Sequence, residues 1–147
     1  QSGLALRWTP EEIRTDHQLV LTAVQHHGEA LEWVGESLQA DPEIVLAAVQ
    51  QNGLALQWAS FDLRGNLEIE LAAVRQNGMA LEWCTQELQS NRSLILAAVS
   101  QNWEALEYVP YELREDPELI SAALRGCGNL DGPDYCSELE IVCTANN

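Results

Sequence analysis

Apolar and polar positions along the chain repeat with a period of 25 residues. The phrase "GLALRW", which begins at Gly3, returns as "GEALEW", "GLALQW", "GMALEW" and "WEALEY" at residues 28, 53, 78 and 103. A constant period of roughly 20–50 residues is typical of solenoid-like arrays, in which each unit buries its apolar face against its neighbours. The pattern therefore predicts an array of about five units.

Five columns of the repeat hold apolar side chains in almost every unit, and these columns form the predicted core. One column contains only Ala, and three contain Val, Ile or Leu. The fifth is aromatic. Their members are Ala23, Ala48, Ala73, Ala98 and Ala123; Val24, Val49, Val74, Val99 and Leu124; Leu19, Ile44, Ile69, Leu94 and Leu119; Ile13, Leu38, Leu63, Leu88 and Leu113; and Trp8, Trp33, Trp58, Trp83 and Tyr108.

Each unit is predicted to contain a helix, a turn and a shorter helix. Asp41 is a good N-cap acceptor, and Pro42 suits the first helical position because its missing N–H costs nothing there. The same cap recurs at Asp16, Asn66, Asn91 and Asp116. We therefore expect Asn91, which begins the glycosylation sequon Asn-Arg-Ser, to cap a helix rather than carry a glycan.

The end of the first helix and the second helical segment are less uniquely specified. Asn52-Gly53 should end the helix with Gly53 in the left-handed conformation. Where Trp103 replaces this glycine, Asn102 is expected to take that conformation instead. Residues 53–64 carry a helical apolar stripe, but Ser60 could cap a separate turn, so both one helix and two shorter pieces fit.

The repeated unit resembles a tandem-repeat family described as domain of unknown function 4116. The family unit reads approximately D-x-E-x-V-L-A-A-V-x-Q-N-G-x-A-L-x-Y-A-S-x-E-L-R, and the resemblance covers residues 3–126. The matching residues of one unit are Asp41, Glu43, Leu46, Ala47, Ala48, Val49, Gln51, Asn52, Gly53, Ala55, Leu56, Ala59, Ser60, Leu63 and Arg64. The chain departs from the family in its aromatic column, where Trp mostly replaces Tyr, and at Trp103. The resemblance implies an all-helical array and no established activity.

Charge restricts the classes of partner. The chain has 7 basic residues, all Arg, and 23 acidic residues, for a formal net charge of −16. This field disfavours binding to nucleic acids and to anionic membranes. No apolar run approaches the roughly 18–20 residues that span a bilayer. We expect other protein subunits as partners, no nucleic acid, and no membrane-spanning segment, although attachment to a membrane complex through protein contacts stays open.

Motifs that carry chemistry are missing from the sequence. It contains no Gly-rich phosphate loop, no nucleophile elbow and no Cys-x-x-Cys pair. A metal site would need His17, His26 or His27 to converge with carboxylates from elsewhere in the fold, and we expect all three to be solvated. Carboxylates are plentiful, but they are expected to lie in solvent columns such as those of Glu12 and Glu43. We therefore expect no catalytic residues, no metal site and no cofactor.

The cysteines fall into two groups. Cys84 shares a column with Val34 and Ala59, and is predicted to be a buried core residue. Cys127, Cys136 and Cys143 lie in the last 21 residues, where the repeat stops. The sequence thus divides into a repeat domain, residues 1–126, and a Cys-rich capping tail, residues 127–147.

A disulfide in the tail, free structural thiols, and a metal or redox role all stay open. The favoured arrangement joins Cys127 to Cys136 or to Cys143, and it would imply an oxidising compartment.

Repetition also identifies apolar residues in columns that are otherwise polar. Leu54 and Met79 share a column with two Glu residues, Phe61 and Tyr111 share another, and Trp103 replaces a glycine. These five are candidate partner-binding residues, because interfaces draw most of their energy from a few aromatic and apolar anchors.

The predicted function is that of a non-catalytic interaction or scaffold protein, an accessory structural subunit of a larger assembly. For a dinoflagellate source, the resemblance would suggest an organellar complex such as a photosynthetic one in the plastid. The alternatives are the interaction domain of an enzyme or effector whose catalytic part lies outside this chain, and an acidic protein that sequesters cations.

Overall fold

The computed structural model describes residues 3–127, and every regular element in that range is helical. Each unit of 25 residues contains a six-residue 3-10 helix, a short helical segment and a long α-helix. The units begin at Gly3, Gly28, Gly53, Gly78 and Trp103. The predicted all-α array of five units is confirmed.

The long helices are α2 (His17–His26), α4 (Pro42–Gln51), α6 (Leu67–Gln76), α7 (Arg92–Gln101) and α9 (Pro117–Cys127). The 3-10 helices that begin the units are η1 (Gly3–Trp8), η2 (Gly28–Trp33), η3 (Gly53–Trp58), η4 (Gly78–Trp83) and η6 (Trp103–Tyr108). The short segments are α1 (Glu11–Arg14), α3 (Glu36–Gln39), α5 (Phe61–Arg64), the 3-10 helix η5 (Leu88–Ser90) and α8 (Tyr111–Arg114).

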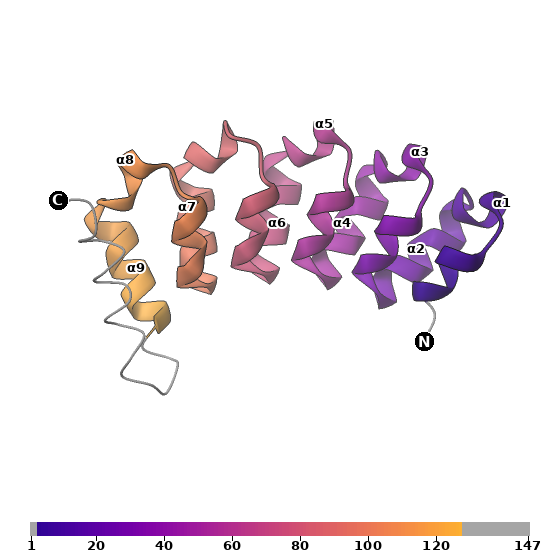
Figure 1. Ribbon diagram of the computed structural model, residues 1–147, viewed down its shortest axis with the longest axis horizontal. Helices are drawn as coiled ribbons and strands as arrows, with labels where there is room; N and C mark the ends of the chain where they lie inside the picture. Colours follow the sequence, from indigo (N-terminus) through magenta and orange to yellow (C-terminus); the bar gives the residue numbers. More distant parts are fainter. Residues whose placement is uncertain (1–2, 128–147) are drawn as a thin grey trace.

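The units stack side by side into an elongated two-layer array (Figure 1). Each long helix contacts the long helices of the adjacent units, and each six-residue 3-10 helix contacts its counterparts in the same way. The short helices lie along one edge of the array, at the top of Figure 1.

The core lies between the two layers and contains three of the five predicted columns, those of Ala48, Val49 and Ile44. The aromatic column and the Ile or Leu column of the short segments are only half-buried in the inner units and pack against this core. In α4, Ile44, Val45, Ala48 and Val49 are all 0% exposed. Exposure is greatest in the first and last units, where Trp8, Leu19 and Leu124 are 81%, 52% and 44% exposed. No described residue covers these side chains, because each unit relies on a neighbour for burial.

Residues 53–64 form two helical pieces, which resolves the alternatives left by the sequence. The 3-10 helix η3 ends at Trp58, and Ala59 is extended with φ −70° and ψ 152°. Ser60 then caps α5 by accepting a hydrogen bond from the backbone N–H of Leu63 at 3.4 Å. This break turns the short helix across the edge of the array.

The long helices begin at the predicted caps. Asp16, Asp41, Asn66 and Asn91 each accept backbone N–H groups of the first turn of the following helix. Asn91 accepts from the N–H groups of Ser93 and Leu94, so its structural role as a cap is confirmed.

The predicted left-handed glycines are wrong. No residue in the described range has a positive φ, and Asn102 has φ −147°. Gly53 is required for a different reason, since a Cβ there would lie less than 3.0 Å from the carbonyl oxygen of Ala73. Its N–H donates to Oε1 of Gln76, which fastens the long helix against the 3-10 helix of the same unit. Close approach, and not backbone conformation, selects glycine at this position.

The predicted cysteine tail lies mainly outside the described residues. Cys127 is the last residue of α9, but its side chain and the whole of Cys136 and Cys143 are outside that description. The proposed disulfide and the capping domain therefore stay predictions. Within the described part, no helix combines the length and apolar character needed to cross a membrane.

Candidate functional site

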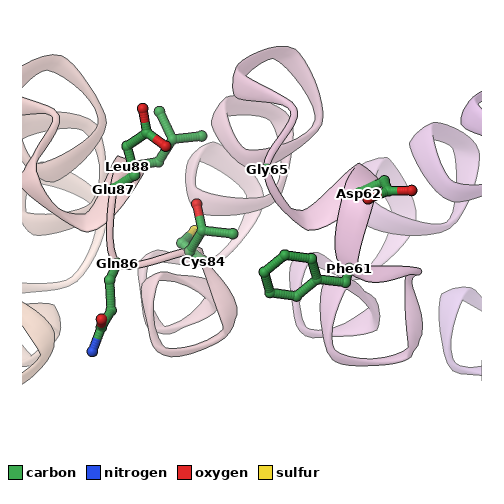
Figure 2. A pocket seen from close by; sticks show the side chains of 8 residues that line it. Phe61, Asp62, Gly65, Cys84, Gln86, Glu87 and Leu88 are labelled. Carbon is green, nitrogen blue, oxygen red and sulfur yellow. The ribbon is translucent and has the colours of Figure 1, made fainter.

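A groove of about 690 Å³ separates the short segments of the third and fourth units. Phe61, Asp62 and Gly65 line one side, and residues 84–88 line the other. The ring of Phe61 points across the groove toward the backbone at Cys84 (Figure 2). Phe61 is 72% exposed, so its ring is an apolar surface in contact with solvent.

The first two units form a corresponding groove of about 570 Å³. It has Glu11 where the third unit has Phe61, Thr15 in place of Gly65, and Val34 in place of Cys84. The groove between the third and fourth units is therefore larger and has an exposed aromatic side chain on one side. The difference is found by comparing residues at equivalent positions of the repeat.

Glu70 lies beneath the groove wall and is a carboxylate in a core column. The same column holds Val20, Val45, Ile95 and Ile120. Glu70 is 0% exposed, its Oε1 accepts the backbone N–H of Thr85 at 3.1 Å, and its Oε2 has no hydrogen-bond partner. The expectation that the carboxylates are solvated is therefore wrong at Glu70, which a comparison along this column of the sequence would have identified.

Glu70 changes the connection between the two units. At earlier junctions, the residue equivalent to Thr85 donates its N–H to a carbonyl of the preceding short helix: Gly35 to Arg14 at 3.1 Å, and Ser60 to Gln39 at 2.9 Å. Thr85 donates to the Glu70 carboxylate instead.

The short segment that follows Thr85 also differs from its counterparts. Residues 86–87 form a turn and Leu88–Ser90 form a 3-10 helix, where each other described unit has a four-residue α-helix. The wall of the groove therefore has an altered backbone.

Burial governs the electrostatics beneath the wall. It raises the pKa of Glu70 to about 7, although the hydrogen bond from the backbone N–H of Thr85 opposes the shift. Burial and the neighbouring Glu70 carboxylate raise the pKa of the Cys84 thiol. A catalytic cysteine needs the opposite shift, toward thiolate. Cys84 is 6% exposed, so the predicted core position is confirmed and the geometry gives it no nucleophilic role.

The other candidate partner-binding residues occupy different places. Met79 and Trp103 are brought together in a second hollow of about 590 Å³, whose lining also includes Glu104 and Arg114. Both apolar side chains are half-buried there. Neither hollow includes Leu54, which is half-buried, or Tyr111, which is 51% exposed. The five candidates thus form no single patch.

His17 keeps 42% of its side chain exposed, but it also approaches two carboxylates. Its Nε2 lies 3.4 Å from Oδ2 of Asp41 and 3.7 Å from Oε2 of Glu43, whereas His26 and His27 are exposed. An imidazole and two carboxylates are possible metal donors, and their ligand atoms lie within 4.8 Å of one another.

The fourth and fifth units place an ion pair at the positions equivalent to this cluster. Arg92 occupies the column of His17 and pairs with Asp116 at 3.0 Å and with Glu118. In the units that have Pro42 or Leu67 in that column, the residue that caps the next long helix is Asn and not Asp. An Asp cap thus occurs opposite His17 or Arg92, and an Asn cap occurs where this column has no cationic side chain. We therefore interpret the histidine cluster as a contact that joins successive helix N-termini.

Comparison with known proteins agrees with the repeat structure. No curated protein and no solved structure matches the chain. A family model described as "Domain of unknown function (DUF4116)" matches residues 1–39, 16–64, 41–89, 66–114 and 91–130. From the second match on, successive matches start one 25-residue unit apart, and together the five cover residues 1–130. The chain belongs to the DUF4116 family.

Proposed function

We propose that the chain is a non-catalytic interaction protein, an accessory subunit that holds other proteins of a larger assembly along its surface. The observation that carries this proposal is Phe61, an aromatic side chain that is 72% exposed beside a groove in a column where Glu11 and Glu36 stand in other units. An aromatic anchor with a polar rim is the usual composition of an interface centre.

The acidic surface supports a protein partner with basic segments. A net charge of −16 attracts such segments and accelerates their encounter with the chain. The rigid stacking of equivalent units also supports the proposal, because repeat arrays present extended binding surfaces whose outward residues can vary without loss of the core.

The test is a triple variant, Phe61→Glu, Met79→Glu and Tyr111→Glu. Glu already stands in the same columns at Glu11, Glu29 and elsewhere, so the helical circular dichroism spectrum should be retained. Association with the native assembly, measured by size-exclusion chromatography coupled to light scattering, should fall sharply. Normal assembly of the folded variant would refute these residues as the anchors.

A further inference from the structure

The junction between the third and fourth units differs from its counterparts in three linked ways. A carboxylate, Glu70, replaces an aliphatic core residue, Thr85 donates its N–H to that carboxylate, and the following short α-helix is replaced by a turn and η5. All three changes meet under the groove that carries Phe61. A buried carboxyl group with an unpartnered oxygen is costly to keep in a core.

The groove offers an aromatic face and carboxylates together. Asp62 and Glu87 occupy the same column of successive units, and both are exposed at the rim. In Figure 2 the Asp62 carboxylate points away from the Phe61 ring, so it must rotate about its side-chain bonds to meet a cation stacked there. The Phe61 ring already accepts a guanidinium, since Cζ of Arg64 lies 5.9 Å from the ring centroid. The rest of that ring remains open to solvent.

These features together match one side chain best. Arginine has a planar guanidinium that stacks on aromatic rings and donates several N–H groups to carboxylates. Its aliphatic stem can contact apolar groups such as Phe61 and Leu88 while the charged end reaches the rim. A lysine would offer the charge without the planar face.

We propose that this groove binds an arginine side chain on a basic segment of a partner protein, and that Glu70 shapes the wall of the groove at this junction. The inference rests on the proposed function, since it names a site and a chemical class for the interaction. Phe61 supplies the stacking surface, Asp62 and Glu87 supply the charge, and Glu70 positions the wall through Thr85.

The first test uses the capped peptide Gly-Arg-Gly-Arg-Gly and two analogues, with Lys or Glu in place of Arg. Titration into the ¹⁵N-labelled chain should produce saturable amide shifts confined to residues 61–65 and 84–88. The Arg peptide should bind more tightly than the Lys peptide, and the Glu peptide should cause no shift. Shifts that spread evenly over the acidic surface, or that are equal for Arg and Lys, would overturn the proposal.

A matched pair of double variants separates the groove from general charge. Asp62→Ser with Glu87→Ser should raise the dissociation constant of the Arg peptide about tenfold. Glu12→Ser with Glu112→Ser changes the same column and the same net charge outside the groove, and should leave the constant nearly unchanged. Ser37 already occupies this column, so both variants should fold. Equal weakening in both would contradict a specific site.

Glu70→Val tests the positioning role, because Val20 and Val45 occupy that column. The variant should regain the short helix after Thr85, with the helical amide pattern of residues 36–39, and should lose most Arg-peptide binding. A more ordered protein that binds the peptide as before would exclude Glu70 from the site. Phe61→Glu provides a second variant that should weaken binding without altering this helix.

The outcomes distinguish this inference from the proposed function. Peptide binding in the groove supports the site even when the triple variant still joins its native assembly. Conversely, failure of the triple variant to assemble, with no peptide binding in the groove, would leave the interaction role standing and remove the arginine site.

Discussion

At the level of single residues, Glu70 couples the stability of the array to pH. Burial moves its pKa from 4.5 to about 7, so the folded chain holds a proton that the unfolded chain releases between these values. The unfolded state therefore binds fewer protons over this interval, and the free energy of unfolding falls as pH rises. The gap between the two pKa values corresponds to about 3 kcal/mol.

Glu70→Val should remove this dependence. The free energy of unfolding of the variant minus that of the parent chain should be about 3 kcal/mol larger at about pH 8 than at about pH 4. Urea denaturation followed by circular dichroism measures the difference at each pH. Glu68→Gln, a change to an exposed residue of the same helix, controls for net charge. A gain that stays constant with pH would show that Glu70 does not titrate in this way.

Glycine offers a second residue-scale test, since two glycines of the third unit, the buried Gly53 and the exposed Gly65, leave different amounts of space for a side chain. At Gly53 an added Cβ would meet backbone at less than 3.0 Å, whereas at Gly65 the nearest atom would lie at 3.6 Å. Gly53→Ala should therefore destabilise the chain by about 1–3 kcal/mol through overpacking. Gly65→Ala should be nearly neutral in the same denaturation experiment, and a comparable loss at both sites would argue against the close-approach explanation.

At the level of elements, the caps determine where each long helix begins. Asn66 accepts the N–H groups of Glu68 at 3.0 Å and Ile69 at 3.4 Å. Asn66→Ala should lower the free energy of unfolding by about 1 kcal/mol, because both donors lose their acceptor. Asn66→Asp keeps an acceptor and should retain the stability of the parent chain. If Ala and Asp behave alike at this position, the side-chain cap contributes little.

At the level of the whole molecule, the 25-residue register should make units removable. Deletion of residues 53–77 joins the second unit to the fourth with every column aligned, so a shorter helical protein should fold. Deletion of residues 53–64 removes only η3 and α5 and should leave an unfolded or aggregated chain. Thermal unfolding monitored by circular dichroism distinguishes the two. The shorter array should also lose Arg-peptide binding, because Phe61 and Glu70 leave with the deleted unit.

The candidate site was predictable only in part. Phe61 stood out because its column is polar in the first two units, and its exposure agrees with that argument. Glu70 follows from the same comparison applied to a core column, yet its contact with Thr85 does not, because an N–H fifteen residues away is brought near only by stacking. The groove itself depends on the spacing between units, which no single column encodes.

The sequence by itself determined the period, the long helices with their caps and the buried columns, since these depend on local propensities and on apolar residues that recur at fixed intervals. Tertiary structure decided why Gly53 must be glycine and how His17 meets Asp41 and Glu43. It also decided where the groove between Phe61 and residues 84–88 lies. These features depend on distances between units. Such distances are fixed by the packing of side chains from neighbouring helices, so they cannot be derived from the sequence of a single unit.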